Sequence, residues 1–194
     1  MSSTHSFKIL GGLGAVTSGI LFFLAHFLNL FGNSEFGTVL GASLVFAAHL
    51  VVVFAFIGLY EAQAERRGLL GMFGMVLGVV GTIVVCAIVY VEIAGASGVD
   101  TSLVFNSYVP NLIKTGSLIF VAGMLLFGIS TMLNNILPRW GGLLLVIGTI
   151  IFALGSFAGN AGPVFSAIGG AITGGGFVWL GIPLLYSNKL KNSK

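Results

Sequence analysis

Charged side chains are scarce in this sequence, and their scarcity excludes an ordinary water-soluble protein. Of its 194 residues, 7% are charged and 57% are hydrophobic. A typical soluble domain carries roughly a quarter charged residues, so a chain of this length with so few charges cannot cover a water-facing surface. Lipid is therefore the expected solvent for most of this chain.

Cysteine and catalytic signatures are also lacking. Cys86 is the only cysteine, which excludes an intramolecular disulfide and a paired-cysteine metal site. The metalloprotease pattern HExxH, the nucleophile pattern GxSxG and the phosphate-binding pattern GxxxxGK[ST] do not occur, and Cys86 has no histidine four residues away. The sequence predicts no catalytic residue and no metal site, and it favours a protein that is not an enzyme.

Basic residues do not form a nucleic-acid surface, although the chain has eight lysines and arginines against five acidic residues. They make no basic stripe with interleaved aromatic residues, so nucleic acid is not an expected partner. Lys189, Lys191 and Lys194 lie in a short tail that is typical of a membrane-proximal anchor. The first apolar run is longer than a signal-peptide core, and no A-x-A cleavage site follows it, so it is predicted to stay as a membrane helix.

Long apolar runs are what the sequence has in abundance. Six stretches of about twenty residues are each long enough to cross a hydrocarbon core of ~30 Å at ~1.5 Å per helical residue. They lack the alternation of membrane strands, and a backbone in lipid must satisfy its own hydrogen bonds. The prediction is an all-α, polytopic membrane bundle of six transmembrane helices in a single domain, residues 1–194. The helices are predicted at about 9–31, 38–60, 69–93, 112–133, 140–159 and 163–186.

The distribution of positive charge predicts an orientation. With the N-terminus in the cytoplasm, the outer segments carry only Lys114, and every other lysine and arginine falls inside. Both termini are then cytoplasmic, in the cytoplasmic membrane of a bacterium or archaeon. The segment "EAQAERRG", Glu61–Gly68, becomes an inner turn that fixes topology, with partner docking or catalysis as the alternative. The inside residues are Lys8, Arg66, Arg67, Arg139, Lys189, Lys191 and Lys194.

The outer loop 95–111 is the one long connection. It mixes turn-forming residues with the apolar patch Leu103–Phe105. Two interpretations stay open: an interfacial connector, or a lid over an outward-facing pocket.

Small residues recur on three predicted helices at steps of four and three. Such seams let helix backbones approach closely, within one bundle, in a homo-oligomer or against a membrane-protein partner. The run Gly174–Gly176 allows an unwound binding segment, but close packing is the favoured interpretation. The seams begin with Gly12, Ala15 and Gly19, with Gly74, Gly78 and Gly81, and with Gly141 and Gly148.

Two of these seams end in an ionisable residue, His26 in the first helix and Glu92 in the third. Both are therefore predicted to face protein near the outer boundary, where Asn29, Lys114 and Asn160 are at a similar depth. An ionisable group within a membrane is a functional-site hypothesis. We expect a ligand or proton site with a hydrogen-bonded Glu92–His26 contact, Lys114 being the competing cation. The alternative is a glutamate at a wet interface and a histidine bonded to a backbone carbonyl.

His26 and His49 raise the question of a haem, because paired helical histidines are the usual axial ligands of membrane cytochromes. The two predicted depths differ by roughly 9 Å at ~1.5 Å per residue, whereas axial ligands of one haem lie near one level. We therefore expect no haem and no other cofactor, and His49 is predicted to form a helix–helix hydrogen bond.

Two stretches resemble known membrane proteins. "GLYEAQAERRGLLGMFGMVLGVVGTIV" (Gly58–Val84) and "LLFGISTMLNNILPRWGGLLLVIG" (Leu125–Gly148) resemble turns of small uncharacterised bacterial integral membrane proteins, with their G-L-Y-x-x-Q-A-x-R-x-G elbow and LPRW corner. This resemblance implies a polytopic bundle and no activity. Size and topology are also similar to the substrate-binding components of energy-coupling-factor vitamin importers, which implies a pocket beneath outer loops; the matching residues are only Ala15 and Gly19.

Three functions remain from the sequence. The first is a non-enzymatic accessory or assembly subunit of a membrane complex, favoured by the seams and the missing catalytic residues. The second is a binding or transport component for a small molecule, favoured by the outer polar residues and the outer loop. The third is a haem- or proton-handling redox protein, resting on His26, His49 and Glu92.

Overall fold

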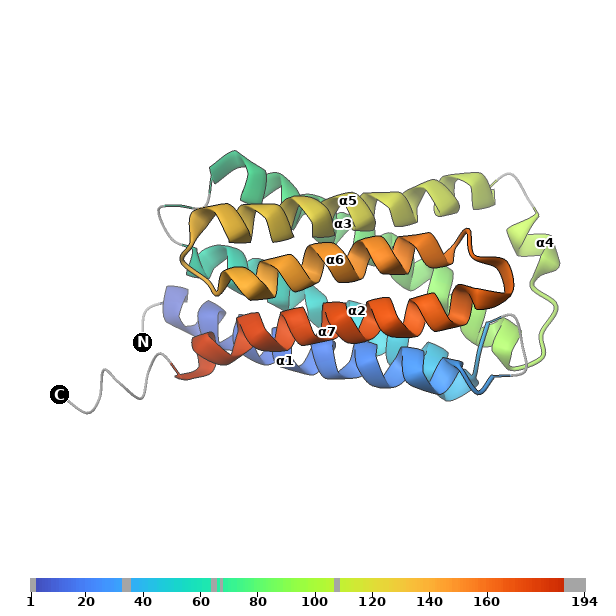
Figure 1. The fold of residues 1–194 in the computed structure, drawn as a ribbon. Helices are drawn as coiled ribbons and strands as arrows, with labels where there is room; N and C mark the ends of the chain where they lie inside the picture. The colour runs from blue at the N-terminus through green and yellow to red at the C-terminus, as the bar shows by residue number, and fades with distance from the viewer. Residues whose placement is uncertain (1–2, 33–35, 64–65, 67, 107–108, 187–194) are drawn as a thin grey trace.

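The computed structural model describes residues 3–32, 36–63, 66, 68–106 and 109–186, without the side chains of 3–5 and 109–115. The fold is all-α, as predicted. A 3₁₀ turn, Gly159–Ala161, precedes the last helix (Figure 1). The helices are α1 Ser3–Asn29, α2 Val39–Ala62, α3 Gly68–Ala96, α4 Ser102–Phe105, α5 Val109–Asn134, α6 Arg139–Gly155 and α7 Gly162–Tyr186.

Five of these helices, α1, α2, α3, α5 and α7, are long and apolar enough to cross a membrane, and α6 is a shorter apolar helix of 17 residues. Their outward side chains are large and apolar, as a lipid-facing surface requires. Leu13, Leu50, Phe73 and Ile83, for example, are all at least half exposed. The chain is built as a multi-pass integral membrane protein.

Several predicted boundaries need correction. The helix predicted at 9–31 begins at Ser3, and the helix predicted at 69–93 extends to Ala96, because hydrogen bonding continues beyond the apolar span. The helix predicted at 140–159 ends at Gly155, where the chain turns toward Gly159, a residue with a φ of 52°. The predicted loop 95–111 is shorter than expected and contains α4, so the described part of the chain has seven α-helices rather than six.

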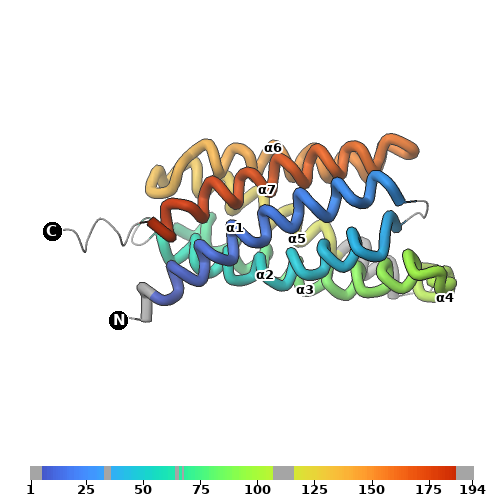
Figure 2. The backbone as a smooth tube through the Cα atoms, turned by 90° about the horizontal axis from the view of Figure 1, so that it is seen from below, coloured from blue at the N-terminus to red at the C-terminus, as the bar shows by residue number. Residues whose placement is uncertain are grey.

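The long helices form a closed ring. Each packs against its neighbours in the order α1, α2, α3, α5, α6 and α7, and α7 packs against α1 to close the ring. The first described turn of α1 and the last turn of α7 lie at one end of the bundle, and α4 lies at the other (Figure 1). Figure 2 shows the long helices running side by side along the bundle axis. A ring of six helices has an interior, which must be filled by side chains or left open.

Glycine pairs set five of the six contacts in this ring. At each of these pairs, a Cβ added to one glycine meets the backbone of the other, so the two helices touch without intervening side chains. The run Gly174–Gly176 lies in unbroken helix, with Gly174 packed on Gly19 and only Gly175 facing open space. The pairs are Gly11–Gly58, Gly19–Gly174, Gly78–Gly123, Gly128–Gly142 and Gly148–Gly169.

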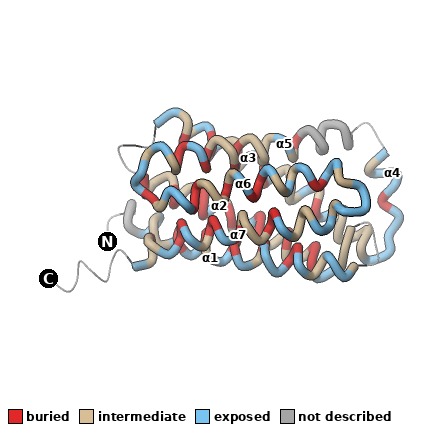
Figure 3. Tube along the Cα trace, viewed as in Figure 1, coloured by how far each residue is buried: buried red, intermediate tan, exposed pale blue. Residues whose placement is uncertain are grey.

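Aromatic side chains fill the part of the interior farther from α4. Phe56 is fully buried and makes edge contacts with Phe127 at 5.3 Å and Phe177 at 6.0 Å between ring centroids. Phe22 stacks on Phe177 at 6.4 Å between ring centroids and lies at the end of this aromatic cluster that is nearer to α4. Figure 3 shows buried residues toward the middle of the bundle and exposed residues along its outside. The cluster closes the ring at this level.

Candidate functional site

Between the aromatic cluster and α4, the interior of the ring is open. The cavity has a volume of about 1280 Å³ and is lined by residues of all seven helices. Phe22, Phe120 and Met124 form its floor where it meets the core. Pockets for drug-sized molecules typically measure roughly 300–1,000 Å³. The cavity therefore has room for a molecule of that size, and the floor separates it from the opposite end of the bundle.

The loop between α3 and α5 forms part of the cavity wall. Asp100, Thr101, Ser102 and Phe105 line it, and Phe105 stacks on Phe36 of the α1–α2 connection at 5.6 Å with an interplanar angle of 21°. Asp100 Oδ1 accepts a hydrogen bond of 2.9 Å from the Ser102 backbone N–H. Hydrogen bonds from Ser102, first from its side chain and then from its backbone, lower the pKa of Asp100. These residues place the described part of the loop in the cavity wall, and whether it acts as a connector or a lid stays a prediction.

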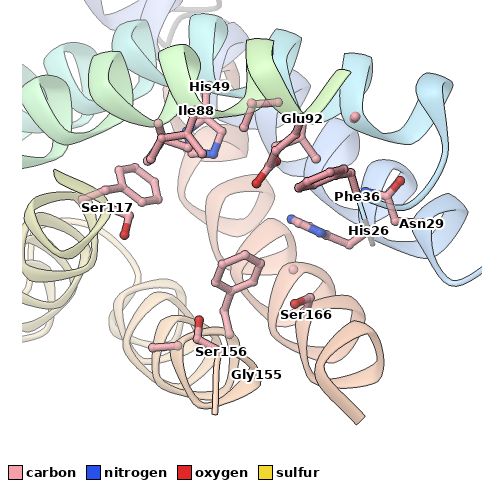
Figure 4. A pocket seen from close by; sticks show the side chains of 18 of the residues that line it. His26, Asn29, Phe36, His49, Ile88, Glu92, Ser117, Gly155, Ser156 and Ser166 are labelled. Atoms are coloured by element: carbon pink, nitrogen blue, oxygen red, sulfur yellow. The ribbon is translucent and has the colours of Figure 1, made fainter. Parts of the chain in front are cut away.

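His26 lies on α1 with its ring directed into the cavity (Figure 4). The His26 ring is stacked with the Phe22 ring at 6.4 Å between centroids. It also makes a T-shaped contact with the Phe152 ring at 5.0 Å between centroids. The side chain is only 8% exposed, yet neither ring nitrogen has a hydrogen-bond partner in the described part of the chain. Buried polar groups are almost always hydrogen-bonded, so His26 offers an unused polar group to the contents of the cavity.

His49 lies on α2, and Thr82 of α3 fixes its ring. His49 Nδ1 lies 2.7 Å from Thr82 Oγ1, and the Thr82 hydroxyl donates a hydrogen bond of 3.1 Å to the His49 carbonyl. A hydroxyl has one proton, so both contacts form together when Nδ1–H donates to Thr82. This assignment leaves His49 Nε2 as a hydrogen-bond acceptor. The predicted helix–helix hydrogen bond of His49 is confirmed.

Glu92 lies near the end of α3 and lines the same cavity, with its carboxylate directed inward (Figure 4). The predicted hydrogen bond to His26 is wrong: no hydrogen bond or ion pair joins these two side chains within the described residues. The ring explains why. Helix α2 lies between α1 and α3, so Glu92 and His26 share the space inside the ring rather than a helix–helix contact.

The other predicted site residues have different outcomes. Asn29 lines the cavity, but its Oδ1 accepts a hydrogen bond of 3.0 Å from the Thr38 N–H, which ties the end of α1 to the start of α2. Asn160 is exposed in the 3₁₀ turn and is not part of the cavity wall, because α6 ends at Gly155 and the chain turns before reaching the depth assumed for it. Lys114 lies in α5, and its side chain is outside the described residues.

Thr149 of α6 is a site residue that sequence reasoning missed. It is 5% exposed and lines the cavity, and its Oγ1 is the only fully buried side-chain oxygen or nitrogen without a partner in the described part of the chain. Helical threonines usually bond to a carbonyl of their own helix, as Thr131 does to Phe127 at 2.8 Å. The sequence held no signal for this residue, because a helical threonine hydroxyl ordinarily bonds within its own helix.

Comparison of the chain with protein-family models, with curated proteins and with solved structures gave no match. The cavity and the residues that line it are therefore the basis for proposing a function.

Proposed function

We propose that this integral membrane protein binds a small amphipathic molecule in the cavity beneath α4. The observation that carries the proposal is a closed-floor cavity lined by His26, a buried side chain whose ring nitrogens have no hydrogen-bond partner among the described residues. Leaving a buried polar group unsatisfied costs about 1–3 kcal/mol, so the His26 ring is stabilised when a ligand bonds to it. The aromatic and aliphatic walls suit the apolar part of the same molecule.

We also propose that all six long helices cross the membrane, with both termini in the cytoplasm and the cavity opening outward. The lysine and arginine bias supports this orientation, and the shared end of α1 and α7 in Figure 1 supports an even number of crossings. Helix α6, with 17 residues, is about 26 Å long at ~1.5 Å per residue, close to the thickness of a hydrocarbon core. The membrane we propose is a bacterial or archaeal cytoplasmic membrane.

An accessory or assembly subunit, the first expectation from the sequence, is the competing proposal. Its main support was the set of glycine seams, which were also a possible contact with a partner or a second copy. In the ring these glycines pack against one another within the chain, as Gly19 does with Gly174. The seams therefore support internal packing, and the unfilled cavity favours the binding proposal.

Native mass spectrometry of the protein purified in mild detergent tests the proposal. We expect a bound small molecule that is retained by the parent and lost from Val121→Trp, which places an indole in the cavity. Val80→Trp is the matched control, because Val80 is 45% exposed on the outer face of α3. Stoichiometric partner subunits with no bound molecule would instead support the accessory role.

A further inference from the structure

We propose that the ligand is a lipophilic organic cation, recognised by the Glu92 carboxylate and the surrounding phenylalanine rings. This inference rests on the proposed function and names the chemical class that the cavity selects.

The charges of the cavity wall favour a cationic ligand. Among the described residues that line the cavity, the charged side chains are Glu92 and Asp100, and both are acidic. A carboxylate within a membrane protein is costly unless a positive partner balances it. Asp100 is exposed, so this cost falls on Glu92, which has no lysine or arginine beside it in the described lining and no bond to His26. A cationic ligand supplies the missing partner, whereas an anionic ligand is repelled by both acids.

The aromatic lining of the cavity also favours a cation. Phenylalanine faces attract cations within about 6 Å of the ring centroid, most strongly where water is excluded. Phe36 lies beside Glu92 (Figure 4), and its ring is held there by stacking on Phe105 and by contact with the backbone at Gly95. A cation at Glu92 would therefore have ring faces close to the carboxylate. The phenylalanines that line the cavity are Phe22, Phe36, Phe105, Phe120, Phe152 and Phe157.

The cavity walls carry hydrogen-bond acceptors that suit a cation with N–H donors. The tautomer fixed by Thr82 leaves His49 Nε2 as an acceptor, and Glu92 adds two acceptor oxygens. A protonated amine donates to such groups, while a quaternary cation relies on charge and ring contacts alone. The volume of about 1280 Å³ leaves room for a bulky apolar body around the charge.

The test uses two probes of the same shape and opposite charge, tetraphenylphosphonium and tetraphenylborate. Equilibrium dialysis against the full-length protein in a neutral detergent gives the dissociation constant of each. We expect saturable binding of the phosphonium and no saturable binding of the borate. Glu92→Gln should weaken phosphonium binding about tenfold or more. Glu61→Gln, which removes the same charge at the opposite end of the bundle, should leave it unchanged.

The outcomes separate the two proposals. If the parent protein binds the borate as well as or better than the phosphonium, the cation proposal is wrong and the cavity remains a binding site; Lys114→Gln then tests whether that lysine holds the anion. If neither probe binds and native mass spectrometry finds no ligand sensitive to Val121→Trp, the proposed function is wrong as well. If Glu92→Gln does not fold, the binding of the two probes to the parent protein decides whether the cavity selects a cation. Glu92→Asp, which keeps the charge, should keep phosphonium binding.

Discussion

A single hydroxyl group joins α2 to α3 at the level of the cavity. Thr82 accepts from His49 Nδ1 and donates to the His49 carbonyl, at the one contact in the ring that no glycine pair sets. The hydroxyl thus holds the two helices together and fixes which nitrogen of His49 faces the cavity as an acceptor. Interhelical hydrogen bonds in membrane proteins contribute about 0.6 kcal/mol on average, and up to about 2 kcal/mol.

Thr82→Val removes that hydroxyl while keeping the shape of the side chain. We expect it to lower stability by about 1 kcal/mol and to release the fixed tautomer, measured by thermal unfolding in detergent and by ¹⁵N NMR of the histidine ring. Thr149→Val is the control, since the Thr149 hydroxyl has no protein partner and its loss should be neutral or stabilising in the unliganded protein. Equal losses in the two variants would contradict the role given to Thr82.

The sequence predicted part of the site at the residue scale. The small-residue seams correctly indicated that His26 and Glu92 face the interior, because a period of 3.6 residues assigns a face without knowledge of the partner helix. The same reasoning could not place Thr149, whose hydroxyl usually bonds within its own helix, or Asn160, whose depth depended on where α6 ends. Residues near helix ends are the ones that periodicity places least well.

Glycine pairs determine how the helices pack against one another. At Gly148, an added Cβ would meet the backbone and hydroxyl of Thr173 and the carbonyl of Gly169, so even alanine forces α6 and α7 apart. At Gly175, on the same helix as Gly169 and Thr173, nothing lies within 4 Å of an added Cβ. Comparing substitutions at Gly148 and Gly175 therefore separates the effect of disturbing a helix–helix contact from the effect of adding a large side chain to a membrane helix.

We therefore expect Gly148→Leu to destabilise the protein by at least the 1–3 kcal/mol or so typical of overpacking, and to abolish probe binding by widening the ring. Gly175→Leu should leave both properties unchanged, because its side chain extends away from the contact. Thermal unfolding and gel filtration in detergent measure the difference. If Gly148→Leu were as stable as Gly175→Leu, the α6–α7 contact would not depend on close backbone approach.

Hydropathy located the long helices but not all of their ends. An apolar run reports which residues sit in lipid, whereas a helix continues until its backbone hydrogen bonds find other partners. Ser3–Lys8 therefore belong to α1 despite their polarity, and Gly155 ends α6 within an apolar stretch. The small helix α4 was hidden in the loop because four residues carry too little periodicity to identify.

The cavity is a property of the whole ring and could not be read from any one segment. It exists because glycines bring the helices together in pairs, while phenylalanines such as Phe56 and Phe177 fill only the half of the interior away from α4. Which helices are neighbours decides what faces the centre. The sequence predicted Glu92 and His26 at one level, but it could not show that α2 lies between their helices. Because of this arrangement the two residues line different walls of one cavity and do not contact each other.

Membrane orientation decides which solution reaches this cavity, and cysteine labelling can measure it. Position 64, in the turn predicted to face the cytoplasm, lies outside the described residues, so the exposed Arg66 is used as the predicted inner site. Ser102, exposed on α4, is the predicted outer site. In a Cys86→Ser background, a membrane-impermeant maleimide applied to intact cells should label Ser102→Cys and not Arg66→Cys. Inverted vesicles should give the opposite pattern.

The Arg66→Cys change leaves six of the seven predicted inside lysines and arginines against Lys114 outside, so the charge bias that sets the orientation is retained. Ser102 lines the cavity, which provides a second measurement on the same variant. Labelling of Ser102→Cys from outside should slow in the presence of tetraphenylphosphonium if the cation occupies the cavity, because the bound probe and the maleimide would compete for the same entrance. Labelling from the cytoplasmic side alone would reverse the bundle and make the ligand a cytoplasmic one, with the cavity and its acidic lining unchanged.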